Sequence, residues 1–143
     1  MIVHISFKAI ADSILAASAM AATGSESDCP PLLTTDHAPM LESCARAALR
    51  SVCFELAPFL DSAELQGEPA DLEFVDEVDP SMSLPLEGAV CDIVAHRVLH
   101  MFFINTWPAL SDAHLEMAAL AMERLQASLM SRPGVNFRIK PGV

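Results

Sequence analysis

The spacing of apolar residues along the chain predicts a mainly helical protein. Apolar side chains recur every three or four positions in four stretches, which are residues 8–23, 36–60, 84–105 and 112–131. That period places them on one face of an α-helix. The third stretch is apolar on nearly every side, which is typical of a helix in the middle of a bundle. Each stretch is therefore expected to form a helix.

Three other segments have patterns that a helix does not explain. Residues 2–7 alternate and contain β-branched side chains, which favours a short strand or an extended arm. Residues 61–80 alternate in part around Leu72 and Phe74, which predicts an extended arm or a short β-hairpin. Residues 132–143 contain two Pro-Gly steps and are expected to form an extended tail. The predicted fold is one mainly α domain, residues 1–143: a small bundle of about four helices with these extended segments and termini.

Charge is distributed unevenly along the chain. The net charge is −11, which disfavours sequence-independent binding to nucleic acid because phosphates carry the same sign. Residues 61–80 hold eight acidic residues and no Lys or Arg, whereas the tail 132–143 holds three of the eight basic residues. The acidic segment fits a solvated loop, or a surface that pairs with the tail within one chain or between adjacent copies. The candidate interface residues are Asp71, Glu73, Asp76, Glu77, Arg132, Arg138 and Lys140.

Composition points to partner contacts rather than to a membrane. Apolar residues make up 52% of the chain and charged residues 19%, so the folded surface is expected to keep apolar patches. No apolar run reaches the roughly 18 residues that a membrane helix needs. Residues 9–22 are similar to the core of a signal peptide, but Asp12 interrupts them. An intracellular product without a membrane segment is expected.

One constellation of residues has the spacing of a metal site. Asp92, His96 and His100 follow one another at intervals of four, which places them on one side of the helix 84–105. Two imidazoles and a carboxylate can bind a transition metal, and His114 or Glu116 in the next helix could complete the set. The sequence lacks an H-E-x-x-H pattern, so the histidines fit better a polar edge of a buried helix that bonds to its neighbours.

Other chemistry has no support in the sequence. The four cysteines form no C-x-x-C pair, and Cys44, Cys53 and Cys91 fall within helical patterns, where they fit reduced thiols packed as small apolar residues. There is no G-x-S-x-G elbow and no glycine-rich phosphate loop. We therefore predict no enzyme activity and no cofactor.

Arg97 stands near the apolar centre of the helix 84–105. A guanidinium there needs a partner, because an unpaired charge in a core is costly. Glu55, Asp92 or an acid from a neighbouring copy could serve. Arg97 is thus expected to be a structural arginine with its head at the surface, or one half of an ion pair between subunits.

The order of these segments resembles a known family. The helix 36–60, the acidic stretch, the apolar helix (GAVCDIVAHRVLHMFFINTWP) and the last helix with its tail are together similar to the small α-helical head–tail connector proteins of tailed bacteriophages. The likeness covers residues 36–140 and lies in organisation, with no invariant motif. The helix 8–23 is an addition to the family's pattern.

The resemblance implies a structural role. Connector subunits form a homo-oligomeric ring between the portal and the tail or neck proteins, and DNA passes through the ring without specific binding. The protein would then be a virion component assembled in the host cytoplasm, with no catalytic residues. The alternative, taken from the residues alone, is a small helical metal-binding protein or enzyme that uses Asp92, His96 and His100.

Overall fold

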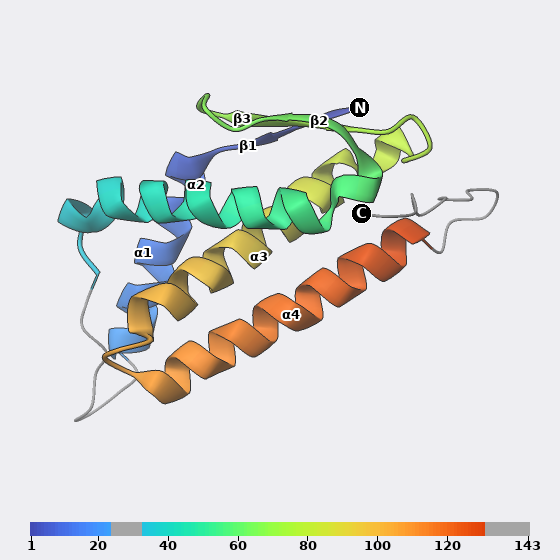
Figure 1. The fold of residues 1–143 in the computed structure, drawn as a ribbon. Coiled ribbons are helices and arrows are strands. Elements are labelled where there is room, and N and C mark those ends of the chain that lie inside the picture. Colours follow the sequence, from blue (N-terminus) through green and yellow to red (C-terminus); the bar gives the residue numbers. More distant parts are fainter. Residues whose placement is uncertain (24–32, 131–143) are drawn as a thin grey trace.

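A computed structural model describes residues 1–23 and 33–130 of the chain (Figure 1). The described residues form four α-helices, three β-strands and short 3-10 turns. The elements in chain order are β1 (Ile2–Ile5), α1 (Phe7–Thr23), α2 (Ala38–Glu55), β2 (Leu60–Glu64), β3 (Ala70–Phe74), α3 (Ser83–Phe103) and α4 (Pro108–Met130). The predicted mainly helical bundle with a short hairpin is confirmed.

Helix α3 lies at the centre of the fold. It packs against α1, α2, α4 and β1, and Figure 1 shows it between α2 and α4. This position explains why its sequence is apolar on nearly every side, since neighbours cover most of its surface. Its buried residues include Val90, Ile93 and Val94, each with no exposed surface. Helix α4, by contrast, packs mainly on α3.

The three strands form an antiparallel sheet in the order β1-β3-β2. The sheet lies across the helices near α2 (Figure 1). Val3 and Leu72 are paired across β1 and β3, and both are buried, so this side of the sheet faces the core. The predicted strand 2–7 is therefore β1, and the acidic stretch 61–80 contains the hairpin β2–β3.

Two predicted helix boundaries were wrong. The helix expected to reach residue 60 ends at Glu55, a 3-10 turn follows over Ala57–Phe59, and β2 begins at Leu60. Pro58 explains this end, because proline has no N–H for the helix and restricts the residue before it. The apolar spacing continues past Glu55 only because Leu56 and Phe59 are buried through the turn.

The last helix begins at Pro108, four residues earlier than the predicted start at residue 112. Proline is well tolerated in the first turn of a helix, where its missing N–H would have no helical partner. Ser111 lies inside the helix and is buried. The predicted tail 132–143 lies outside the described residues. None of the described helices is long and apolar enough to cross a membrane.

Candidate functional site

The acidic hairpin places its charges on the side of the sheet that faces away from the helices. Residues directly opposite each other in an antiparallel pair share a face. Asp71 is opposite His4 and Glu64, and Glu73 is opposite Ser62. We call the surface formed by Glu64, Asp71 and Glu73 the acidic face. The predicted interface residues Asp71 and Glu73 therefore lie together on this face.

Two of these carboxylates have polar partners on neighbouring strands. The Nδ1 atom of His4 lies 2.6 Å from Oδ1 of Asp71, and the hydroxyl of Ser62 donates to Oε2 of Glu73 at 2.9 Å. Both contacts are exposed to solvent. The other two acidic interface candidates, Asp76 and Glu77, are exposed in the turn that follows β3. The basic candidates Arg132, Arg138 and Lys140 lie outside the described residues.

The tip of the hairpin is fastened to the helices beneath it. The guanidinium of Arg46 on α2 donates to the backbone carbonyls of Leu65 and Gly67. It also lies 4.1 Å from the ring centroid of Phe7, within the range of a cation–π contact. The backbone N–H of Phe7, at the start of α1, donates to the Glu68 carboxylate at 3.0 Å. The acidic face is thus held at a fixed place on the bundle.

Both outer strands of the sheet, β1 and β2, lack a strand partner on one side among the described residues, and β2 is the more exposed of the two. Strand β2 pairs with β3 on one side, and no strand within residues 1–23 and 33–130 pairs with its other side. Residues 61–64 are all exposed. The ladder is also irregular between Leu60 and Ser62, so Asp61 forms a bulge at the start of the strand. The order of strands in a sheet depends on contacts between distant segments, so this edge was not predictable from the sequence.

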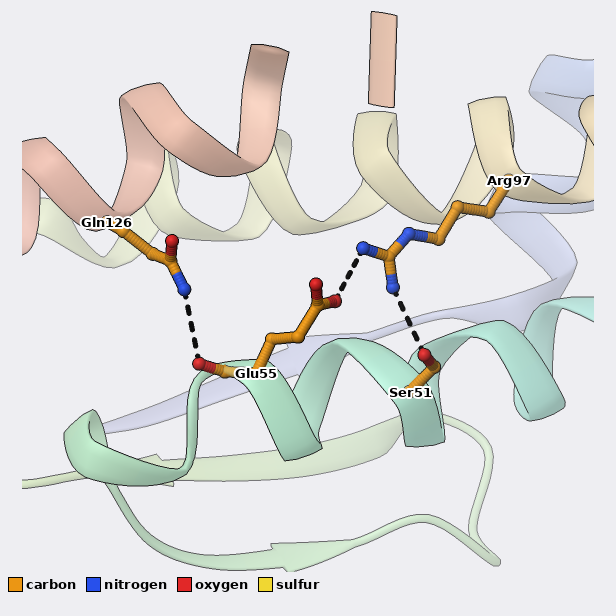
Figure 2. Close-up of polar contacts among 4 residues, drawn as sticks. All are labelled: Ser51, Glu55, Arg97 and Gln126. Atoms are coloured by element: carbon orange, nitrogen blue, oxygen red, sulfur yellow. Dashed lines mark hydrogen bonds and ion pairs between the residues drawn. The ribbon is translucent and has the colours of Figure 1, made fainter. Parts of the chain in front are cut away.

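Arg97 has its partner within the chain. Its Nη2 atom lies 2.5 Å from Oε2 of Glu55, and its Nη1 atom donates to the hydroxyl of Ser51 at 3.3 Å. Figure 2 shows the guanidinium reaching from α3 to α2, and Gln126 of α4 donating to the backbone carbonyl of Glu55. Of the three partners considered from the sequence, Glu55 is the one the fold supplies. The side chain of Arg97 is only 19% exposed, so this pair joins α2 to α3 beside α4.

The histidines form a polar seam between α3 and α4. The Nδ1 atoms of His96 and His114 are 3.0 Å apart, so one ring donates to the other. His100 contacts the buried hydroxyl of Ser111 at 2.7 Å through Nδ1, and that hydroxyl also donates to the His100 carbonyl at 2.8 Å. This is the arrangement expected of a helix edge whose histidines bond to a neighbouring helix.

Asp92 does not join these histidines. It is exposed and lines a shallow hollow with Met82, Pro85 and Arg124, away from the two contacts of the seam. In the part of the chain that the structure describes, no group of three or more His, Cys, Asp and Glu side chains is placed to hold a metal ion. The set Asp92, His96 and His100 is therefore not assembled as a site.

Lowering the pH is expected to weaken the seam. Burial, together with the nearby His96 and His100, lowers the pKa of His114 below its ordinary value of 6.5. At His114 the unfolded chain then binds a proton more readily than the folded chain does. The contribution of neutral His114 to the free energy of unfolding is therefore complete above about pH 6.5 and is lost as the pH falls below that value. Urea midpoints measured on both sides of pH 6.5 should show this loss for the native chain and much less of it for His114→Gln. The exposed His4→Gln is the control that keeps the loss, and an unchanged profile for His114→Gln would contradict the role of the seam.

Two of the described cysteines are expected to be unreactive in the folded protein. Burial raises the pKa of the Cys53 and Cys91 thiols from 9.0 to about 11. Because the thiolate is the reactive form, alkylation at neutral pH should slow by about a hundredfold relative to the unfolded chain. Peptide mass spectrometry after iodoacetamide treatment, with and without urea, measures the difference. Equal rates in the two conditions would show that these helix faces are open to solvent.

The comparisons with known proteins assign no family. No family model, no curated protein and no solved structure matches this chain. The acidic face, the open edge of β2 and the seam of histidines are therefore interpreted from their own geometry.

Proposed function

We propose that this protein is a structural subunit of a tailed-bacteriophage virion, a head–tail connector. Its copies would form a ring between the portal and the tail, extend the channel for DNA and be assembled in the host cytoplasm. The observation that carries the proposal is the separation of charge between two parts of the chain. An acidic hairpin is held firmly on the bundle, and the segment with matching positive charge follows the last helix.

Charge supports this role in two ways. Copies that present an acidic surface to one neighbour and a basic segment to another attract one another head to tail, and such contacts close into rings when the rotation permits. The net charge of −11 also repels the phosphate backbone, so DNA inside such a ring would slide without being bound.

Exposed apolar side chains support contacts with other proteins. Helix α4 packs mainly on α3 and leaves Leu115, Met117 and Leu120 about half exposed. On α2, Phe54 is 83% exposed. Large apolar side chains clustered along one exposed helix are typical of surfaces that meet partners. In the proposed assembly, these helices would contact adjacent copies or the portal and tail proteins.

Negative-stain electron microscopy tests the proposal directly. Purified protein at increasing concentration, alone and mixed with phage portal rings, is expected to form rings with a central opening. A chain that forms no ring in either condition and does not bind to the portal would overturn it.

A further inference from the structure

We propose that the open edge of β2 binds residues 135–140 of a second copy as a fourth, antiparallel strand. This inference rests on the proposed ring and names the contact that joins one subunit to the next. The occupant is one segment of this chain, contributed by a neighbour.

The edge offers backbone groups to a partner strand. An edge strand presents unpaired N–H and C=O groups along one side, and an extended segment can pair with them by strand addition. In β2 this side is open among the described residues, and residues 61–64 are exposed. Ala63 lies opposite the buried Leu72 and so belongs to the inner side of the sheet, yet it is exposed. Apolar side chains of an added strand could therefore pack against the inner side of the sheet next to β2.

Residues 135–140 have the sequence pattern of such a strand. Side chains alternate between the two sides of a strand, and this segment alternates apolar with polar or basic residues. Its sequence is VNFRIK, with Pro-Gly steps at 133–134 and 141–142. In a strand, Phe137 and Ile139 would face one side and Arg138 and Lys140 the other. The apolar side fits the uncovered inner side of the sheet at β2, and the basic side fits the acidic face.

Charge selects this occupant over another copy of β2. Two β2 edges pairing with each other would bring Asp61 and Glu64 of one copy close to the same residues of the other. Like charges across a strand pair destabilise it, and opposite charges stabilise it. The acidic edge therefore disfavours pairing with itself and favours a basic strand. Within this chain, the alternating segment that carries Arg138 and Lys140 has the required charge.

The chain path favours the tail of a second copy over the chain's own tail. Gln126, in the last turns of α4, donates to the Glu55 carbonyl at 3.3 Å, and Figure 1 shows α4 ending at the end of the molecule where β2 begins. The five Cα–Cα steps from Met130 to residue 135 span at most about 18 Å, and a start at the Glu64 end would use about 13 Å of that for the length of β2 alone. The chain's own tail would therefore reach β2 most directly near Leu60, and from there it would run parallel to β2.

A parallel strand would not suit this sheet. Both of its strand pairs are antiparallel, and its acidic face is open to solvent, which is typical of antiparallel sheets, whereas sheets made of parallel strands are covered on both faces. The tail of a second copy can enter at the Glu64 end and pair antiparallel. Repetition of that contact from each copy to the next has the head-to-tail form that a ring requires.

A pair of charge-reversal variants of the full-length chain tests the inference. The edge variant is Asp61→Lys with Glu64→Lys, and the tail variant is Arg138→Glu with Lys140→Glu. Each variant alone places like charges at the proposed contact, so assembly should need about a tenfold higher concentration than for the native chain at low salt. In an equimolar mixture, the native tail of one variant meets the native edge of the other, and the reversed pair is also attractive. The mixture should therefore assemble at native concentrations in alternating order.

Native mass spectrometry with one variant isotopically labelled detects assemblies that contain equal numbers of the two variants, as alternation requires. Asp12→Lys with Glu87→Lys, one exposed acid on α1 and one on α3, is the matched control and should assemble like the native chain. Pairing of each tail with its own chain predicts that the mixture behaves like the separate variants, and that result overturns the inference. Single variants that assemble like the native chain also overturn it.

Hydrogen exchange separates a failure of this inference from a failure of the proposed function. The amides of residues 60–64 should exchange more slowly in the assembled native chain than in the dilute chain, because strand addition protects an edge. If rings form but these amides remain unprotected, the proposed ring stands and the proposed strand contact is wrong. Alternating pairs without closed rings would support the contact and contradict the connector role. A native chain that stays monomeric at every concentration, both alone and mixed with portal rings, does not bind the portal and keeps its β2 amides unprotected would overturn both.

Discussion

A chain that ends at residue 131 is expected to stay monomeric at concentrations where the full-length protein assembles. The deletion removes Arg138 and Lys140, which carry the basic side of the proposed strand, and leaves the acidic edge without a partner. The buried core of the described residues lies between Val3 and Leu129, so the helical core should remain folded. Light scattering after size-exclusion chromatography measures the mass, and far-ultraviolet circular dichroism checks the fold.

A second variant separates the charge pattern from the length of the tail. The control keeps 143 residues and replaces residues 135–140 with Gly and Ser, and it should be as monomeric as the truncated chain. If both variants assemble like the native chain, the contact between subunits lies elsewhere on the surface. If only the Gly-Ser variant assembles, the tail acts through its length, and the strand proposed for residues 135–140 is wrong.

The substitution Phe74→Ala is expected to destabilise the protein by about 3–5 kcal/mol, the usual cost of removing a buried phenylalanine side chain. Phe74 lies at the end of the central strand β3 and has no exposed surface. A domain of this size is typically stable by only about 5–15 kcal/mol, so the variant should unfold at a much lower urea concentration. Urea unfolding followed by circular dichroism gives the free energy of unfolding.

Phe54→Ala is the matched control for this substitution. The same side chain is removed, but Phe54 is 83% exposed on α2, so its stability should change by no more than about 0.5 kcal/mol. The two variants together test whether the sheet is packed on the helices. Similar losses of stability for both variants would show that the side chain of Phe74 is not buried against the helices.

The helices were largely predictable from the sequence, because apolar residues at helical spacing form one face that packs against the core. The range 84–105 predicted α3 nearly to its ends, and its apolar surface predicted a central position. The end of α2 was not predicted, because Leu56 and Phe59 continue the apolar spacing through a turn. The hairpin was one of two alternatives for the acidic stretch, since pairing with β1 depends on a contact between residues about 70 positions apart.

The candidate sites were less predictable than the helices. Asp92 and His100 are eight residues apart, which separates their Cα atoms by about 12 Å along a helix, and this distance explains why they do not share one site. The sequence placed His96 and His100 on one side of α3 but could not show that His114 and Ser111 of α4 would meet them. Arg97 was predicted to need a partner, and only the packing of α2 on α3 identified Glu55.

Native mass spectrometry of the purified protein over a range of concentrations tests the connector proposal most directly, because it reports the number of subunits and any bound metal together. The proposal predicts a ring of identical copies that carries no metal ion. A chain that remains a monomer at every concentration and retains one metal ion per copy would contradict it.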